Sequence, residues 1–484
     1  MFEGLRRTRG LFHFEAMESG AHRGETKPGA RGIMRTDILH KGAGKLTYEI
    51  RNIIGIAEKL QQMGVKVNLE NIGDPVAKGE KIPAWMKAIV ADLAMQDGSY
   101  GYCPTQGILE TREFLARRIN CNGGVRITPE DIVFFNGLGE AITKVYGLLR
   151  STARIITPSP TYTTHSASEA AHAGQPPVSY PLDPHNHWYP DTRELRRRVK
   201  YNPSVAGILL INPDNPTGAV YPESILHEIV AIAGEFDLFI IADEIYQNLV
   251  YNGRKAKPLA DIIGDVPGLA MKGISKELPW PGARCGWIEI YNADKDPHFA
   301  RYVRSINNAK MVEVCSTTLP QKAIPRIFGH PEYDGWLEER RRRYERLSNL
   351  AYEQLKNVPG VLVNRSDGAF YMSVVFEAGV LNGRQTLPIG IREAGDLVEE
   401  LTRDGDMQPD KRFVYYLLAS SGICVVPLSS FNTELQGFRM TLLEQDEAEF
   451  RGIIDNLSHN IRLYLASSPR ESQRDAPRFG SAAA

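Results

Sequence analysis

Two lysines lie four residues apart in the segment MKGISKELPWPGARCGW, which covers residues 271–287. Lysine forms Schiff bases with carbonyl compounds, and partial burial or a nearby cation lowers the pKa of its amine and frees it for attack. Lys276 has Ser275 beside it and Arg284, whose rigid guanidinium suits a phosphate, eight residues further on. Lys276 is therefore the candidate for covalent chemistry, and we interpret Lys272 as a structural residue of the preceding strand-like run. An ordinary surface position is the alternative for any single lysine.

Four further strand-like runs also end in glycine-rich or polar segments. These are NGLGE, PSPTY, INPDNPTG and ADEIY, which begin at residues 136, 158, 211 and 242. In α/β sheets, ligands bind beyond the carboxyl ends of the strands. One polar strand end is weak evidence, but five ends, with GISK as the fifth, predict a single site.

Each segment has a chemistry of its own and an alternative without a ligand. NGLGE exposes backbone N–H groups where a helix begins, which suits a phosphate, although a glycine-rich turn alone would look the same. The prolines of NPDNPTG hold its asparagine amides away from a helix, so these amides either donate to a ligand or bond their own backbone. Asp243 ends the most apolar run and needs a partner there: an arginine, a helix N-terminus or a protonated ring nitrogen. Tyr246 can present its hydroxyl at the same place.

Together these groups are those expected in a binding site for pyridoxal 5′-phosphate (PLP). This cofactor acts as an electron sink while its ring nitrogen stays protonated. The order NPDNPTG, then DEIY, then SK followed by Arg284 resembles the fold type I PLP-dependent enzymes, and among them the class I and II aminotransferases. The resemblance spans about residues 45–450. Within the family the chain is most similar to the alanine (glutamate–pyruvate) aminotransferase branch, through YEIR, NIGDP, GYCPTQG, INPDNPTGAVY, ADEIY, GISK and FRMTLL.

The resemblance implies a role for each side chain around the cofactor. Lys276 is the Schiff-base lysine and the acid–base that moves a proton between the substrate and the cofactor. Asp243 pairs with the ring nitrogen, and Tyr162 stacks on the ring. Asn215 and Tyr246 bond the phenolic oxygen.

The resemblance also implies which groups hold the phosphate. These are the backbone N–H groups of Leu138 and Gly139 and the side chains of Ser275 and Arg284. Tyr102 is similar to the family tyrosine that reaches the phosphate of the neighbouring subunit. A homodimer with shared active sites is therefore expected.

Four residues are implied to bind the substrate. Arg439 in GFRMTLLE matches the arginine that holds the α-carboxylate with two parallel hydrogen bonds. Gly73 in NIGDP fits the close approach of the backbone to that carboxylate. Tyr48 and Arg51 match a pair that the alanine branch places near the substrate.

Three segments depart from the family pattern. These departures bear on the identity of the amino-acid substrate and not on that of the cofactor. VVPLSSFN stands at 425–432, where many relatives have PGSxFG, and ELPWPGAR is an unusual filling between Lys276 and Arg284. The segment 310–320 lacks the arginine with which aspartate aminotransferases hold a distal carboxylate. Its absence argues against aspartate as the substrate.

We therefore expect a PLP-dependent aminotransferase with a ping-pong mechanism, with alanine as the amino acid and 2-oxoglutarate or pyruvate as the 2-oxo acid. Branched-chain, aromatic or methionine-type substrates remain alternatives, as does a PLP-dependent lyase or synthase on the same fold. A regulator that binds PLP without turnover is a third interpretation, against which Lys276 and Arg439 argue.

The elements that must position these residues alternate along the chain. Short β-branched runs separated by helical patterns predict an α/β fold, with a mainly parallel sheet covered by helices on both faces. The runs lie at 131–136, 154–158, 205–212, 237–244, 268–274 and 286–290. The resemblance to the aminotransferases implies that this α/β fold is PLP transferase fold type I, with a smaller α+β domain.

The pattern of predicted helices and strands changes near Pro320, and this change indicates a domain boundary. A large PLP-binding domain is expected at 81–320 and a small C-terminal domain at 321–468, which residues 34–80 join. The arginine run 340–343 lies on a predicted helix, and we interpret it as a solvated face. At the ends of the chain, a flexible extension is expected at 1–33 and a disordered tail at 469–484.

The bulk composition excludes several classes of protein. The 484 residues are 42% apolar and 24% charged with a net charge of −1, so the chain lacks the basic surplus typical of binding to nucleic acid or an anionic membrane. No apolar run reaches the roughly 20 residues of a membrane span. Five scattered cysteines give neither a disulfide framework nor a metal-ligand spacing, so no metal site is predicted and a cytoplasmic location is expected.

Overall fold

The computed structural model describes residues 38–46, 49–403, 405 and 407–467, without the side chains of residues 49–51. From Lys41 onward the chain forms one compact unit, to which all elements below belong. The extension expected at 1–33 and the tail expected at 469–484 lie outside the described residues.

The helices and strands follow one another in the alternation that the sequence predicts. The helices are α1 (Glu49–Gln62), α2 (Ala84–Ala94), α3 (Leu109–Asn120), α4 (Leu138–Gly147), α5 (Thr163–Ala173), α6 (Thr192–Tyr201), α7 (Glu223–Glu235), α8 (Leu259–Ile262), α9 (Pro297–Val312), α10 (Thr318–Phe328), α11 (Tyr333–Leu355), α12 (Arg392–Leu401), α13 (Pro409–Ser421) and α14 (Glu447–Ala466). The strands are β1 (Asn68–Leu69), β2 (Ile132–Phe135), β3 (Arg154–Ser159), β4 (Ser179–Asp183), β5 (Tyr189–Pro190), β6 (Val205–Ile211), β7 (Phe239–Asp243), β8 (Gly268–Gly273), β9 (Gly286–Tyr291), β10 (Val361–Val363), β11 (Tyr371–Phe376), β12 (Ile423–Cys424), β13 (Val426–Pro427) and β14 (Gly437–Thr441).

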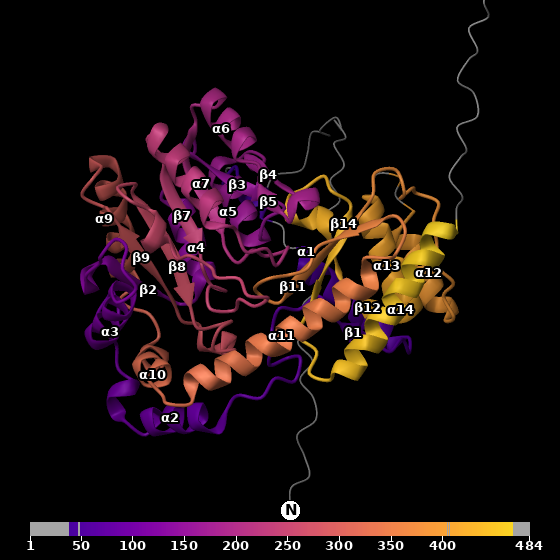
Figure 1. The fold of residues 1–484 in the computed structure, drawn as a ribbon, viewed down its shortest axis with the longest axis horizontal. Coiled ribbons are helices and arrows are strands. Elements are labelled where there is room, and N and C mark those ends of the chain that lie inside the picture. Colours follow the sequence, from indigo (N-terminus) through magenta and orange to yellow (C-terminus); the bar gives the residue numbers. More distant parts are fainter. Residues whose placement is uncertain (1–37, 47–48, 404, 406, 468–484) are drawn as a thin grey trace, which may run out of the picture. The chain divides into compact units, whose positions relative to one another are not determined.

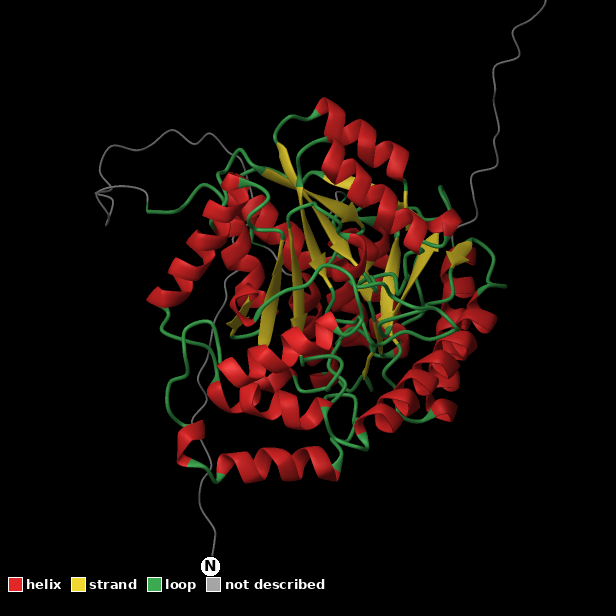
Figure 2. Ribbon diagram, turned by 60° about the vertical axis from the view of Figure 1, so that its left-hand side comes forward, coloured by secondary structure: helices red, strands yellow, loops and turns green. Residues whose placement is uncertain are grey.

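Eight strands of the described chain form the large sheet, in the order β2-β9-β8-β7-β6-β3-β4-β5. The pairs from β8 through β7, β6 and β3 to β4 are parallel, whereas β9 runs antiparallel to both of its neighbours and β5 runs antiparallel to β4. Helices flank this sheet on both sides (Figures 1 and 2). The predicted α/β class with a mainly parallel, helix-covered sheet is confirmed.

Alternate residues of the central strands face two separate cores. In β7, Ile240 and Ala242 belong to one core and Ile241 belongs to the other, which α4 and α9 also line. Successive side chains of a strand point to opposite faces. Asp243, the last residue of β7, and Glu244, which follows it, are therefore directed to opposite faces of the sheet.

A second sheet has four antiparallel strands in the order β10-β11-β14-β13. Arg439 lies in the middle of β14, between Ser373 of β11 and Val426 of β13. The short strand β1 pairs in parallel with β12, which a single residue separates from β13. This pairing supports the proposal that the segment before residue 81 joins the small domain.

The longest helix among the described residues, α11, extends in Figure 1 from the neighbourhood of α10 to that of α14, against which it packs. The interpretation of its arginine run as a solvated face is wrong for three of the four arginines, among them the half-buried Arg341, whose Nε donates to the carbonyl oxygen of Asn248 at 2.6 Å. Arg340 is 3% exposed and its Nε lies 2.5 Å from Oε1 of Glu80, and the half-buried Arg343 lies 2.6 Å from Oε2 of the same carboxylate. Arg342 stays exposed. Glu80 comes 260 residues before Arg340, so no local pattern reveals the contact.

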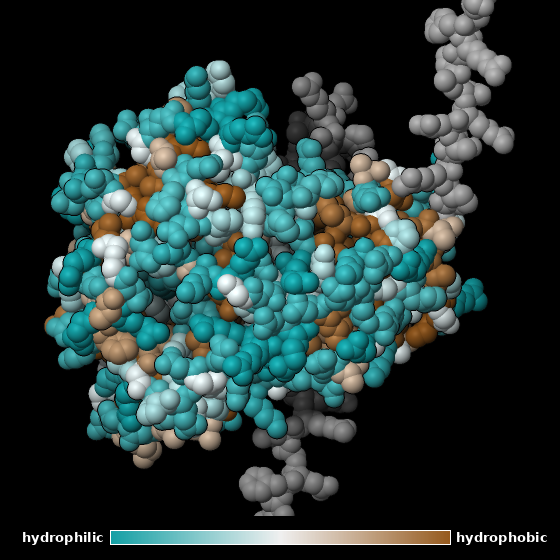
Figure 3. Space-filling model, in the orientation of Figure 1, coloured by the Kyte–Doolittle hydropathy of each residue, from teal (hydrophilic) through white to brown (hydrophobic). Residues whose placement is uncertain are grey.

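The described residues contain no helix that is both long and apolar enough to cross a membrane. On the face of the molecule that Figure 3 shows, hydrophilic residues cover most of the surface, and hydrophobic residues appear in separate patches. Among the described residues, buried apolar side chains form two cores on the faces of the large sheet, and one of these cores also includes residues of the small sheet. Burial of these side chains is the main force that holds the strand ends in place.

Candidate active site

The five polar strand ends meet at one edge of the large sheet. β3, β6, β7 and β8 are parallel neighbours, so their carboxyl ends lie side by side. β2 shares their direction, because β2 and β8 are both antiparallel to β9. Phe135 at the end of β2 and Gly273 at the end of β8 pair with the same residue, Gly286. This register brings NGLGE, the loop after β8 and Arg284 into one neighbourhood.

The part of the site formed by NGLGE suits an anion. α4 begins at Leu138, and its N-cap is Gly137 at φ 87°, a conformation that favours glycine. The first N–H groups of a helix have no partner within it, so those of Leu138 and Gly139 can bind a ligand. Arg284 donates from Nη2 to the carbonyl oxygen of Asn136 at 3.4 Å. A Cβ on Gly137 would lie 2.6 Å from that Nη2, so the guanidinium lies directly against the start of the helix.

Asp243 ends β7 with 3% of its surface exposed, and a histidine is its partner. Its Oδ1 accepts the backbone N–H of Ile245 at 3.2 Å, and its Oδ2 lies 3.1 Å from Nε2 of the buried His165. The hydroxyl of Tyr146 lies 3.3 Å from the other ring nitrogen. The ring of Tyr162 meets the His165 ring edge-on, with centroids 6.2 Å apart. His165 was not predicted, although it follows PSPTY closely in the sequence.

Lys276 lies half-buried in the loop after β8. Its Nζ donates to the carbonyl oxygen of Gly73 at 2.6 Å and lies 5.7 Å from the centre of the Phe370 ring. A side chain on Gly73 is excluded, because its Cβ would overlap the hydroxyl of Tyr371. Tyr246 donates to that same hydroxyl at 3.2 Å. Two predicted residues, Gly73 and Tyr246, thus lie against Tyr371, which was not predicted, and Lys276 contacts the backbone of Gly73.

Arg439 is 2% exposed and reaches from β14 to the large sheet. Its Nη1 donates to Oδ1 of Asn215 at 3.3 Å, and its Nη2 donates to the carbonyl oxygen of Asn71 at 2.5 Å. The guanidinium carbon lies 4.4 Å from the centre of the Tyr371 ring and 5.0 Å from that of the Phe431 ring. Two aromatic rings and two oxygen atoms therefore fix the plane of this cation.

Several buried polar atoms of this region have no hydrogen-bond partner among the described residues. They are Nε of Arg439, both side-chain amide atoms of Asn71 and Nδ2 of Asn212. Each buried unpaired polar group costs about 1–3 kcal/mol, so their concentration is typical of a site whose ligand supplies the partners. A cation at a helix start, a buried carboxylate, a phenol, an amide and a lysine are also the donors and acceptors that PLP requires. The residues present fit this cofactor.

The remaining predicted residues differ in how far the structure places them. Ser275 is half-buried next to Lys276, within the loop after β8. Tyr102 is 87% exposed on the surface of the single chain. Arg51 lies in α1 but its side chain is not described, and Tyr48 lies outside the described residues.

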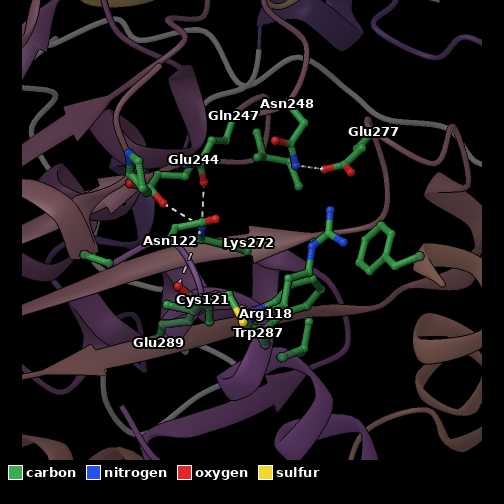
Figure 4. A pocket seen from close by; sticks show the side chains of 17 residues that line it. Arg118, Cys121, Asn122, Glu244, Gln247, Asn248, Lys272, Glu277, Trp287 and Glu289 are labelled. Carbon is green, nitrogen blue, oxygen red and sulfur yellow. Dashed lines mark hydrogen bonds and ion pairs between the residues drawn. The ribbon is translucent and has the colours of Figure 1, made fainter. Parts of the chain in front are cut away.

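Lys272 lies on the opposite face of the sheet from the site, as the strand alternation requires. Its Nζ donates to Oε1 of Gln247 at 2.5 Å and lies 2.9 Å from Glu244 and 3.7 Å from Glu289. These four residues line a cavity of about 450 Å³ (Figure 4). Burial alone would lower the pKa of Lys272, but Glu244 and Glu289 outweigh it and raise the pKa above its ordinary value. The amine stays protonated, in agreement with a structural role.

The two unusual segments both contact the site. In VVPLSSFN, the ring of Phe431 lies against Arg439, and its carbonyl oxygen accepts the N–H of Thr161 from PSPTY at 2.8 Å. ELPWPGAR forms a short 3-10 turn, Pro281–Ala283, directly before Arg284. One segment thus connects the small sheet to the strand ends, and the other leads from Lys276 to the anion site.

The NPDNPTG segment contains a buried acid with a testable pH dependence. Asp214 accepts the N–H of Thr217 at 3.1 Å and its hydroxyl at 2.5 Å, yet burial raises the pKa of Asp214 to about 7. A carboxyl whose folded-state pKa exceeds its unfolded value loses stability as the pH rises between the two values. Asp214→Asn should therefore raise the free energy of unfolding at pH 8, by at most about 4 kcal/mol, and by less than half of that at pH 5. Thermal melts at both pH values measure this, and an equal effect at both would contradict it.

His165 should contribute to cofactor binding through Asp243. His165→Leu removes the group beside a buried carboxylate, and a hydrogen bond to a charged group is worth about 1.5–3 kcal/mol. We expect its Kd for PLP to rise about tenfold or more. In His165→Gln the amide can take the position of Nε2, so this control should retain most of the affinity. Equilibrium dialysis with PLP measures both variants, and equal losses would contradict a role through that nitrogen.

The fold and the site together define a class of protein. Lys276 lies in a loop at the edge of a mainly parallel sheet, and Arg439 reaches the same place from a smaller sheet. This arrangement is typical of the fold type I PLP-dependent enzymes.

Comparison with known proteins narrows this class. The family model "Aminotransferase class I and II" matches residues 66–456, and the chain belongs to this family of PLP-dependent aminotransferases. An uncharacterized aminotransferase of Methanocaldococcus jannaschii is 60% identical over 432 residues, which cover 89% of this chain and 100% of that protein. The glutamate-pyruvate aminotransferase AlaA of Escherichia coli K12 is 30% identical over 338 residues, covering 69% and 82%. The structure of an alanine aminotransferase from Pyrococcus furiosus has a TM-score of 0.74 at 27% identity, covering 88% and 99%.

Proposed function

We propose that this aminotransferase moves the amino group of L-alanine to 2-oxoglutarate in a ping-pong reaction, with pyruvate and glutamate as products. One observation carries the proposal: Lys276 and Arg439 reach the same three residues of backbone. The Lys276 Nζ lies 2.6 Å from the carbonyl oxygen of Gly73, and the Arg439 Nη2 lies 2.5 Å from that of Asn71. An α-amino acid carries its amine and its carboxylate on one carbon, so a lysine and an arginine that converge in this way suit it.

Residues from four strand ends would hold the cofactor. Arg284 and the start of α4 would bind its phosphate, and Asp243 its ring nitrogen. Asn215 and Tyr246 would bond its phenolic oxygen, with Lys276 as the point of covalent attachment. When bound, PLP supplies a carbonyl that captures amino groups and a ring that withdraws electrons from the substrate's Cα.

The protein's own groups would control the protons. Asp243, held in place by His165, keeps a proton on the ring nitrogen. Burial raises the pKa of Tyr246 well above its ordinary value, so its hydroxyl stays neutral and able to donate. Lys276, once its amine is free, would take the proton from the substrate's Cα and pass it to the cofactor.

The surroundings of Arg439 favour a small α-amino acid as the donor. Its unpaired Nε leaves capacity for an α-carboxylate, and the rings that flank it fix the plane in which that carboxylate can bind. The segment 310–320 has one cation, Lys310, which is buried and paired with Glu140 and Glu313. This segment offers no charge for the distal carboxylate of aspartate, so the distal carboxylate of 2-oxoglutarate has to bind elsewhere. The alanine aminotransferases among the relatives support alanine as the donor.

A homodimer with shared active sites is part of the proposal. Tyr102 is 87% exposed in the single chain, and Tyr100 and Met95 nearby are 77% and 85% exposed. Exposed apolar and aromatic residues in one region mark an interaction surface. Sedimentation equilibrium of the purified protein should give twice the chain mass, and a monomer at micromolar concentration would contradict this part.

A screen of donors tests the substrate. PLP-loaded protein is mixed with each of the twenty amino acids, and the visible absorbance of the cofactor and the matching 2-oxo acid are followed. Alanine is expected to react fastest. If a branched-chain, aromatic or methionine-type amino acid reacted at least about tenfold faster than alanine, that amino acid would be the proposed donor instead. Release of ammonia, without transfer of the amino group to the cofactor, would favour a lyase or synthase.

A further inference from the structure

The loop that carries Lys276 is held from behind by a residue of α11. Arg340 lies 64 residues after Lys276 and is 3% exposed. Its Nη1 donates to the carbonyl oxygen of Glu277 at 2.5 Å, and both Nη1 and Nη2 lie 3.3 Å from the carbonyl oxygen of Lys276. One guanidinium thus binds two consecutive carbonyl groups of the loop.

Arg340 is itself fixed on its other side. Its Nε lies 2.5 Å from Oε1 of Glu80, and Nη2 donates to the hydroxyl of Tyr344 at 2.9 Å. Its guanidinium carbon lies 5.1 Å from the centre of the Trp336 ring. Arg343 approaches the second oxygen of the same Glu80 carboxylate at 2.6 Å. A buried charge with this many partners has little freedom to move.

The same helix also holds the side chain of Glu277. The hydroxyl of Tyr333, the first residue of α11, donates to Oε1 of Glu277. Asn248 donates to Oε2 of the same carboxylate at 2.8 Å (Figure 4). α11 therefore binds the residue next to Lys276 by its side chain as well as by its backbone. The loop between β8 and the turn at Pro281–Ala283 contains no regular element that would hold it otherwise.

We propose that Arg340 is a positioning residue, which fixes the main chain at Lys276–Glu277 and thereby directs the Lys276 amine toward Gly73 and the reacting carbon. The proposal rests on the proposed role of Lys276. Arg340 touches neither substrate nor cofactor and acts through the lysine. Because a misplacement of about 1 Å can cost about 10²-fold in rate, a looser loop should lower kcat. Arg439 lies on another sheet, so binding of the amino acid should change little.

Two variants test the proposal, with a third as control. Arg340→Lys keeps a positive charge beside Glu80 but cannot bind both carbonyl groups, and Glu80→Gln leaves Arg340 in place while loosening it. Arg342→Met, on the exposed side of the same helix, is the control. Steady-state kinetics with alanine, the pH midpoint of the visible absorbance of bound PLP, and hydrogen exchange of the peptide 273–281 are measured for each.

Arg340→Lys should lower kcat about tenfold to a hundredfold with KM for alanine within about threefold. It should also shift the pH midpoint and speed exchange in 273–281, and Glu80→Gln should do the same to a smaller extent. Wild-type values of all three measures in both variants would overturn the proposal. So would a loss of activity that follows only the folded fraction of both variants. If borohydride reduction of the wild type places no pyridoxyl group on Lys276, the proposed function itself fails, which is a separate result.

Discussion

Replacing Lys276 with alanine is expected to lower kcat for alanine by about 10⁴-fold or more. The variant loses both the amine proposed for covalent attachment to the cofactor and the base proposed for the substrate's Cα, and base catalysis alone contributes about 10²–10⁴-fold. The cofactor should still bind, because Asp243, Asn215 and Arg284 remain. Borohydride reduction followed by peptide mass mapping should find the pyridoxyl group on Lys276 of the wild type and nowhere in the variant.

Lys272 provides the matched control for this experiment. Lys272→Met leaves Glu244 and Glu289 without their buried cation, so we expect a lower melting temperature. The pyridoxyl group should nevertheless still be found on Lys276. If Lys276→Ala still formed the reducible adduct, or if Lys272→Met abolished it in folded protein, the assignment of the two lysines would be wrong.

Replacing Arg439 with alanine is expected to lower kcat/KM for alanine by about 30-fold to 5,000-fold. Truncating one partner of a buried, hydrogen-bonded charge pair costs about 2–5 kcal/mol, and the α-carboxylate is the charge that would lose its partner. Arg439→Lys should recover part of this loss, since it retains the charge but not the planar fork.

A substrate without a carboxylate separates binding from folding in this variant. Ethylamine offers the amine of alanine alone, so wild-type protein should strongly prefer alanine over it. In Arg439→Ala that preference should fall by about the same factor as kcat/KM. An unchanged preference, in protein that still binds PLP, would show that another group holds the carboxylate.

The sequence predicted the strand ends because β-branched runs and turn residues are local properties. The runs at 205–212 and 237–244 form β6 and β7, and ADEIY places Asp243 at the edge of the sheet. β4 and β5 were missed. The residues of β4 alternate between half-buried and buried, but Pro181 at its middle argues against a strand, and β5 is only two residues long.

The parts of the site that were missed depend on contacts between distant segments. The role of His165 depends on its contact with Asp243, which follows it by 78 residues. The role of Tyr371 depends on its contact with Tyr246, which precedes it by 125 residues. Arg340 has the charge pattern of an exposed helix and is buried because Glu80 and the Lys276 loop lie beside it. A single sequence without these contacts gives a tyrosine in a strand, a histidine in a helix and a charged run, each with an ordinary explanation.

One turnover with alanine alone tests the central claim most directly. PLP-loaded protein at known concentration is mixed with L-alanine in the absence of any 2-oxo acid. We expect one pyruvate per active site, no ammonia, and then no further product until 2-oxoglutarate is added, which should release one glutamate per site. Continued pyruvate formation with release of ammonia, or no pyruvate at all from protein that binds PLP, would contradict the account.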